Sequence, residues 1–304
     1  MSRLTIWGSV FCLGGCFALA AAADAADVAK SDLPDARAKA IEQAAPDQAP
    51  AKPAKPRKVL VYGRVPTHPE SVPCCFKAME VLGKKSGAFE ATCSGDPAVF
   101  LPERLEQFDA VVMNNTHEGH PLLPQDFGKL DKDQQAAAKQ REAACKKALL
   151  DFVAGGKGLV GIHGATCSVQ WPEYLEMLGG SYGGHIAGKV WVKAEEPGHP
   201  TCAALEGKSF QVEDEIYIFS RPYNRSKLRI LLVLDLSKTP DPKKRPDKDY
   251  AVSWVRSYGK GRVFYCSLGH THAAFANPQV MRHYLAGIQF AIGDLAGECA
   301  PREK

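Results

Sequence analysis

The sequence predicts an α/β protein whose sheet is mostly parallel, is covered by helices on both faces and is extended by a C-terminal β region. Three observations indicate this class. Apolar runs such as those within 58–64 and 158–164 are typical of parallel strands that are buried on both faces. Helical patterns separate the early runs, which indicates βαβ units. After about residue 188, strand patterns follow one another with little helix between them.

The first half alternates between the two kinds of element. The long helix expected at 131–154 has apolar residues at helical spacing and a glycine stop. In chain order, the expected elements are a strand at 58–64, a helix at 72–87, a strand at 89–94, a short helix at 101–107, a strand at 108–116, the helix at 131–154 and a strand at 158–164.

The second half supplies the added β region. The expected elements are strands at 188–196, 210–219 and 228–235, a hairpin at 249–269 and a closing amphipathic helix at 277–295. No internal repeat is visible, so we expect one domain at 58–294 and a tail at 295–304.

Composition argues against a nucleic-acid partner. The chain has 304 residues, is 45% hydrophobic and 24% charged, and carries a net charge of +4. Basic and acidic residues are interspersed, so no large positive field is expected. The densest basic run, at 241–249, is broken by proline and aspartate and is interpreted as a solvated loop.

The N-terminus predicts export to the periplasm or the medium. Residues 1–26 contain Arg3, an apolar stretch from about 4 to 20 and a small-residue end, which is the pattern of a cleavable signal peptide. The stretch LGGC, ending at Cys16, also resembles a lipoprotein cleavage box. Lipidation of Cys16 is therefore the alternative, and only in that case do we expect membrane attachment, since no other segment is long and apolar enough to span a bilayer.

Residues 27–57 are expected to be a disordered linker rich in Ala, Pro and Lys. They contain almost no large apolar side chains, and alternating prolines favour an extended, solvated chain. We therefore expect that removal of residues 1–57 leaves a folded domain.

The cysteines do not point to a thiol chemistry. The sequence has ten, and cleavage of the signal would leave eight, some of which could pair in an oxidising compartment. No C-x-x-C motif occurs, so a thiolate zinc site is not expected. Cys167 lies four residues after the turn apex at His163 and has no activating motif, so we do not expect it to be a nucleophile.

Polar side chains follow several predicted strands. His163 occupies a Gly-x-His-Gly turn after the strand at 158–164, where many α/β hydrolytic enzymes place a Ser or Cys nucleophile. His117 and His270 follow two further strands. Because ligands bind at the carboxyl ends of parallel strands, we expect these three histidines to share one polar pocket. Residues in the same strand-end loops that we expect to bind ligand are Arg64, Asn115 and Glu118, and His68 also follows the first strand.

Three further candidates come from a glycine-rich loop and a later strand. His185 lies in the segment GHIAG, and Asp214 and Glu215 lie in VEDEIYIF. The two acids either cap a strand and pair with Arg221 or Arg225, or one of them is a general base or metal ligand. In the second case we assign Glu215 to catalysis and His185 and Asp214 to ligand binding.

The order of these motifs resembles the ThuA-like (trehalose utilization) family. The strand-end GIH, the DEIY strand and the hairpin GKGRVFYCSLGH are the most specific parts, and the resemblance covers roughly residues 58–294. It implies a flavodoxin-like three-layer fold similar to class I glutamine amidotransferases. Those enzymes have a Cys at the elbow and a His-x-Glu pair. Here His163 stands at the elbow and His270-Thr-His272 stands late in the chain, so a glutamine amidotransferase is not expected.

The family's link to disaccharide catabolism implies a sugar or keto-sugar ligand. The favoured hypothesis is an exported bacterial enzyme, an isomerase, lyase or hydrolase, in which the catalytic candidates transfer protons. These candidates are His163, His117, His270 and Glu215.

Two points are left open by the sequence. His163 and His270 could hold a divalent metal, and the aromatic residues Trp171, Tyr182 and Tyr217 could stack on a sugar. The alternative to an enzyme is a non-catalytic domain that binds a carbohydrate or another small ligand and has lost the amidotransferase nucleophile.

Overall fold

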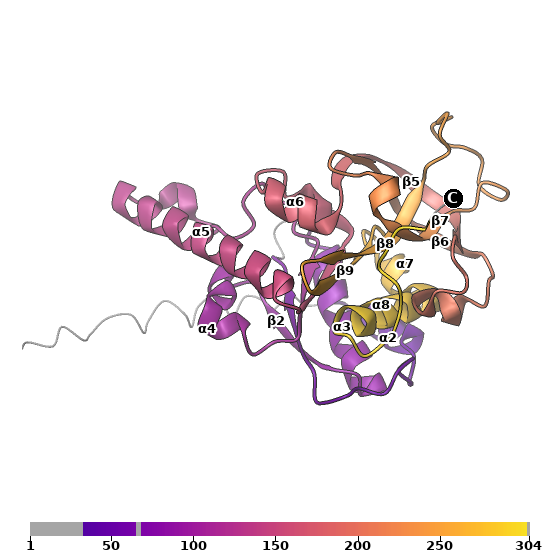
Figure 1. Ribbon diagram of the computed structural model, residues 1–304, viewed down its shortest axis with the longest axis horizontal. Helices are drawn as coiled ribbons and strands as arrows, with labels where there is room; N and C mark the ends of the chain where they lie inside the picture. Colours follow the sequence, from indigo (N-terminus) through magenta and orange to yellow (C-terminus); the bar gives the residue numbers. More distant parts are fainter. Residues whose placement is uncertain (1–32, 65–67, 303–304) are drawn as a thin grey trace, which may run out of the picture.

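The computed structural model describes residues 33–64 and 68–302. The predicted signal peptide at 1–26, with Cys16, lies outside these residues. A nine-stranded sheet in the order β2-β1-β3-β4-β9-β8-β7-β5-β6 runs through the described chain (Figure 1). The strands are β1 (Lys58–Tyr62), β2 (Glu90–Ser94), β3 (Ala110–Asn114), β4 (Gly158–Ile162), β5 (Ser181–Ala194), β6 (Phe210–Ser220), β7 (Arg229–Leu234), β8 (Ala251–Tyr258) and β9 (Gly261–Cys266).

Helices surround this sheet, and none in the described ranges is both long and apolar enough to cross a membrane. The helices are α2 (Asp35–Ala44), α3 (Ser71–Ser86), α4 (Pro102–Leu105), α5 (Lys132–Ala154), α6 (Pro172–Leu178), α7 (His272–Phe275) and α8 (Pro278–Ala291).

The sheet has a parallel half and an antiparallel half. The strands from β2 to β9 in the sheet order pair in parallel, and those from β9 to β6 pair antiparallel. The prediction of a mostly parallel sheet is therefore wrong, although the α/β class and the added β region are observed. The physical reason is connection length. Parallel neighbours need a crossover of a dozen or more residues, and β8 and β9 are joined by a tight turn that permits only antiparallel pairing.

Helices cover both faces of the parallel half (Figure 1). Successive residues of β1 point to opposite sides. Val59 and Val61 pack in one apolar cluster with α3 and α8, whereas Leu60 and Tyr62 pack in the other with α5 and α6. Burial on both faces explains why β1, β3 and β4 are continuous apolar runs in the sequence.

Residues 33–57 are packed on the domain, so the prediction of a disordered linker is wrong for them. Helix α2 buries Ile41 completely in the core cluster that contains α3. Further along, the backbone of Ala51 exchanges two hydrogen bonds with the side chain of Gln289 on α8, and Arg57 pairs with Asp294. The amino-acid composition of this segment suggested disorder, but alanine and proline can cover an existing apolar surface without forming a core of their own.

Replacing Ile41 with alanine is expected to lower the free energy of unfolding by about 2–4 kcal/mol, because it leaves a cavity at a fully buried site. Glu42→Ala is the matched control. Its side chain is exposed on the same helix, so we expect a change within about 0.5 kcal/mol. Urea unfolding of both variants measures the difference, and equal stabilities would mean that α2 does not pack on the domain in solution.

His283 on α8 lies in the core and hydrogen-bonds to two other elements of the fold. It is 1% exposed, and its ring nitrogens lie 3.0 Å from the Thr201 carbonyl oxygen and 2.8 Å from the Ser253 hydroxyl. The ring thus joins α8 to β8 and to the 3₁₀ helix at Pro200–Leu205. Burial lowers the pKa of His283 from 6.5 to about 4, although the Thr201 carbonyl opposes the shift.

The lowered pKa of His283 predicts acid sensitivity. As the pH falls below 6.5, the unfolded chain binds a proton at His283, and the folded chain does not until about pH 4. Stability that is complete above pH 6.5 is therefore lost down to about pH 4, by on the order of 3 kcal/mol from this group. Urea unfolding across this range should show a smaller loss for His283→Gln than for the native chain. An identical pH dependence would contradict the assignment.

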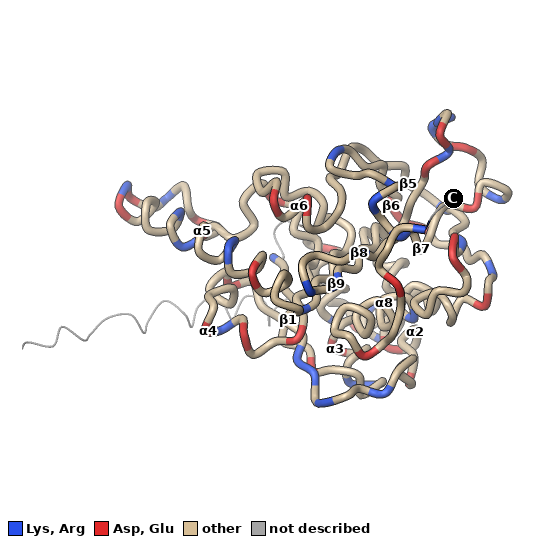
Figure 2. Tube along the Cα trace, in the orientation of Figure 1, with Lys and Arg blue, Asp and Glu red and all other residues tan. Residues whose placement is uncertain are grey.

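Charged side chains are interspersed along the described chain. Figure 2 shows Lys and Arg alternating with Asp and Glu on the helices and loops. The expectation that nucleic acid is not a partner remains a prediction, and this distribution is consistent with it.

Candidate functional site

His163 directly follows β4, an interior strand of the parallel half between β3 and β9, and begins a short 3₁₀ helix at His163–Cys167. Its backbone φ is 44°, in the left-handed region that residues other than glycine seldom adopt. Such conformations persist only where the surroundings hold them, and they concentrate at functional sites. The sharp strand-to-helix turn expected from the sequence is therefore present, with histidine at its apex.

The His163 ring is held in one tautomer. Its Nδ1 lies 2.6 Å from the carbonyl oxygen of Ser267, which can only accept, so Nδ1 carries the proton and donates it. The Nε2 atom is consequently the hydrogen-bond acceptor of the ring, and His270 Nδ1 is its partner. The residue is fully buried, and burial lowers its pKa well below 6.5, against the opposing effect of the Ser267 carbonyl. His163 is thus a neutral imidazole with a defined acceptor atom.

The acceptor atom of His163 lies in a compact triangle of three polar atoms. His270 Nδ1 is 3.2 Å from His163 Nε2. Glu215 Oε2 is 3.6 Å from that nitrogen and 3.4 Å from His270 Nδ1. The three side chains come from the end of β4, the loop after β9 and the middle of β6. His270 is 34% exposed and Glu215 19% exposed, so solvent reaches the triangle from their side.

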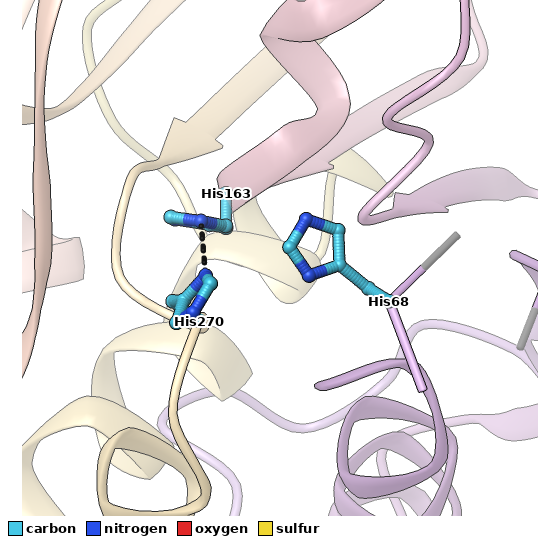
Figure 3. Close-up of side chains that lie close together, drawn as sticks. All are labelled: His68, His163 and His270. Carbon is cyan, nitrogen blue, oxygen red and sulfur yellow. Dashed lines mark hydrogen bonds between the residues drawn. The ribbon is translucent and has the colours of Figure 1, made fainter. Parts of the chain in front are cut away.

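His68 completes what we call the histidine cluster, which consists of His68, His163 and His270. One ring nitrogen from each lies within 4.8 Å of the others, and Figure 3 shows the His68 ring directed toward the other two. Burial, together with the charges of His117 and His270, lowers the pKa of His68 to about 4. The sequence placed His68 after the first strand, but we did not select it. The observation that polar residues follow strand ends included His68, but it gave no reason to rank His68 with His163; the structure supplies one, because β1 lies two strands from β4.

Asp214 positions the loop that carries His270. Its two carboxylate oxygens accept backbone N–H groups from Gly269, His270 and Thr271, at 2.6, 3.0 and 2.8 Å. Burial raises the pKa of Asp214 to about 7, and the N–H donors oppose this shift. With its oxygens engaged in this way, Asp214 supports the loop, and its role in binding ligand stays a prediction.

Glu215 is oriented by neighbours on β5. His185 Nε2 lies 3.5 Å from Glu215 Oε1, and His185 Nδ1 lies 2.8 Å from the Tyr182 hydroxyl. Tyr182, His185 and Glu215 thus form a chain that ends at the triangle. The alternative pairing of these acids with Arg225 is wrong, since that arginine binds Glu195 and Asp249.

The remaining strand-end candidates surround the cluster. His117 is exposed, and its ring centroid is 5.2 Å from that of His68, so it lies at the rim. Asn115, with φ of 50°, accepts the Gly164 N–H and donates to the Gly269 carbonyl. It therefore ties the loop of His163 to the loop of His270.

Arg64 and Glu118 form a partly buried pair at 3.0 Å. Arg64 also donates to the Tyr62 hydroxyl and to the Leu123 carbonyl. Burial raises the pKa of Glu118 above its ordinary value, and the Arg64 charge opposes the shift. Through these contacts Arg64 holds the loop after β3, and its role in binding ligand stays a prediction.

Cys167 is a buried thiol. It is 8% exposed, its Sγ is 3.9 Å from the Tyr217 hydroxyl, and burial raises its pKa to about 12. A thiolate nucleophile is therefore not favoured at this position. The eight cysteines of the described chain are all unpaired.

The three aromatic candidates differ in exposure. Trp171 is 1% exposed and stacks on Tyr174, and Tyr217 is 2% exposed with its ring 4.2 Å from that of His163. In this structure Trp171 and Tyr217 therefore pack against protein side chains. Tyr182 is partly exposed.

These features define an α/β domain that carries a histidine, in place of a Ser or Cys, at the strand-to-helix elbow. The chain belongs to the ThuA family, whose description is trehalose utilisation and which matches residues 58–291. The recognition made from the sequence motifs is thereby confirmed.

Solved structures with the same fold include two putative ThuA-like proteins. The protein from Bacteroides uniformis is 21% identical, with a TM-score of 0.59, over 80% of this chain and 94% of that one. The protein from Parabacteroides merdae is 16% identical, with a TM-score of 0.57, over 79% and 91%. At these identities the likeness concerns the fold alone.

A curated relative covers a smaller part of the chain. The tyrosine-protein kinase YwqD of Bacillus subtilis is 34% identical over 102 residues, which are 33% of this chain and 40% of that protein. The present sequence contains no G-x-x-x-x-G-K-[S/T] phosphate loop.

Proposed function

We propose that this protein is an exported enzyme that acts on a sugar or keto-sugar, with its chemistry at the His163–His270–Glu215 triangle. The observation that carries the proposal is the unprotonated Nε2 of His163, held at a strained elbow within hydrogen-bonding distance of His270 and beside Glu215. A C–H bond next to a sugar carbonyl is acidic enough for a neutral imidazole to remove its proton. Isomerisation, elimination and hydrolysis through an enol all begin with this step.

The residues of the triangle fit such a step. Donation from His163 Nδ1 to the Ser267 carbonyl stabilises the ring when it gains positive charge, and the Glu215 carboxylate stabilises the same charge. His270 and the exposed His117 can exchange the proton with solvent. The sugar class comes from the family's description, and the partly exposed Tyr182 ring offers an apolar face of the kind that sugars stack on.

Deuterium incorporation tests the proposal without requiring the product to be known. Keto-disaccharides in D₂O should gain deuterium beside the carbonyl, or be converted, when the purified protein is added, as followed by NMR. The rate should fall in His270→Ala and persist in His120→Ala, an exposed histidine that pairs with Glu142 away from the triangle. Ligand binding without exchange or conversion would instead identify a non-catalytic carbohydrate-binding domain.

Export is a separate proposal and rests on residues 1–26. Fractionation of bacteria that express the full chain should find it in the periplasm or the medium. Attachment to membranes that is lost in Cys16→Ser would identify lipidation in place of simple export, and a cytosolic protein would contradict both.

A further inference from the structure

We propose that His68, His163, His270 and Glu215 form a binding site for one divalent transition-metal ion of the zinc type. The four side chains come from four separate segments, namely the loop after β1, the end of β4, the loop after β9 and strand β6. Their ligand atoms nevertheless converge on one point. Nitrogen and oxygen donors without a thiolate suit zinc and its neighbours in the first transition series.

The distances among the inner three donor atoms fit an ion. Two ligands that each lie about 2.1 Å from a tetrahedral zinc ion are about 3.4 Å apart. The edges of the triangle formed by His163 Nε2, His270 Nδ1 and Glu215 Oε2 are 3.2, 3.4 and 3.6 Å. His68 approaches this triangle as the third imidazole, within 4.8 Å of the other two (Figure 3).

The neighbours of these donors resemble an outer coordination shell. A metal-binding histidine usually donates its second ring N–H to a carbonyl or carboxylate, which fixes the tautomer and the ring plane. The bond from His163 Nδ1 to the Ser267 carbonyl has this role. Glu215 is oriented in the same manner through Oε1 by His185, which Tyr182 contacts in turn. Asp214 fixes the backbone on either side of His270.

An ion would also use lone pairs that otherwise face one another. His163 Nε2 and the Glu215 carboxylate are both acceptors, and the group between them is His270 Nδ1, which lies 3.2 Å from the first and 3.4 Å from the second. A divalent ion satisfies both groups at once.

The inference deepens the proposed function but does not rest on it, because metal binding is measured without any sugar. A bound ion would polarise a carbonyl or hydroxyl pair of the substrate. It would engage the lone pairs of His163 and His270, and proton transfer would then fall to His117 at the rim.

Calorimetric titration of the chelator-treated protein with Zn²⁺ tests the site. We expect one ion per chain. Affinity should fall by about tenfold in His185→Ala, which removes an outer contact, and by more in Glu215→Gln and His270→Ala, which remove donors. His120→Ala is the matched control, with unchanged affinity expected. Circular dichroism confirms that the compared variants are folded, and His163→Ala is avoided because that side chain is fully buried.

Substitution with Co²⁺ supplies a second readout. Its visible absorption should indicate four or five ligands and should change in His270→Ala. No binding of Zn²⁺ by the native chain, or binding that Glu215→Gln and His270→Ala leave unchanged, would overturn the inference. If the protein binds Zn²⁺ but a chelator does not change the rate of sugar turnover, the binding site is supported. In that case the ion takes no part in the reaction.

Discussion

Replacing His163 with asparagine is expected to lower the rate of deuterium exchange or conversion of a keto-disaccharide by about 100-fold or more. The reason is the loss of the Nε2 atom, which removes the proton when no ion is bound and holds the ion when one is bound. Asparagine is chosen because it tolerates the left-handed backbone, with φ of 44°, better than most residues do. A lower rate in this variant therefore reflects the loss of the imidazole ring and not a distortion of the turn. NMR in D₂O measures the rate in both proteins.

The same variant should also lose stability. His163 is fully buried and donates to the Ser267 carbonyl. Without that donor the buried carbonyl is left unpaired, which costs about 1–3 kcal/mol. Rates are therefore compared at a temperature where both proteins are folded.

Cys167→Ser is the control for this prediction. Cys167 lies in the same 3₁₀ helix as His163, and burial raises the pKa of its thiol to about 12. We expect the rate to be largely retained. If the rate instead disappeared in folded Cys167→Ser and remained in His163→Asn, a thiol nucleophile would replace the histidine mechanism.

The strands and helices of the parallel half could be predicted because each is indicated by the pattern of its own residues. A strand buried on both faces, such as β4, must be a continuous apolar run, and its helices show helical spacing. Whether the later strands pair in parallel or antiparallel could not be predicted in this way. Pairing direction depends on which strands become neighbours, and the sheet places β7 between β5 and β8.

Part of the site could be predicted from the rule that ligands bind at the carboxyl ends of parallel strands. That rule selected His163 and His270, which the structure brings within 3.2 Å. It could not separate a side chain that faces the triangle from its neighbour that supports a loop. Asp214 and Glu215 are adjacent in one strand, and only the folded chain shows that the first binds backbone N–H groups and the second faces His163.

Helix α2 shows a different limit. Its apolar content is too small to suggest a buried helix, and its packing depends on one isoleucine among alanines. A segment of this kind is stabilised by the surface it covers, and that surface is made by elements distant in the sequence, here α3 and α7. The composition of the segment alone therefore cannot predict that α2 packs on the domain.

Replacing Asp214 with asparagine is expected to lower the free energy of unfolding by about 3 kcal/mol. The carboxylate presents only acceptors to three backbone N–H groups, those of Gly269, His270 and Thr271. An asparagine must place its NH₂ group where one oxygen was. In either orientation of the amide, at least one buried N–H then faces a donor and loses its partner.

The loosened loop should be measurable at the site as well as in global stability. Amide hydrogen exchange of residues 269–271 is expected to accelerate in Asp214→Asn, and Zn²⁺ affinity should fall because His270 is less well positioned. Glu213→Gln is the matched control. Its side chain lies on the same strand, is 58% exposed and pairs with Lys189, so we expect little change in either measurement. Protection of residues 269–271 that is equal in the two variants would show that Asp214 does not hold the loop, and the order of His270 would then need another cause.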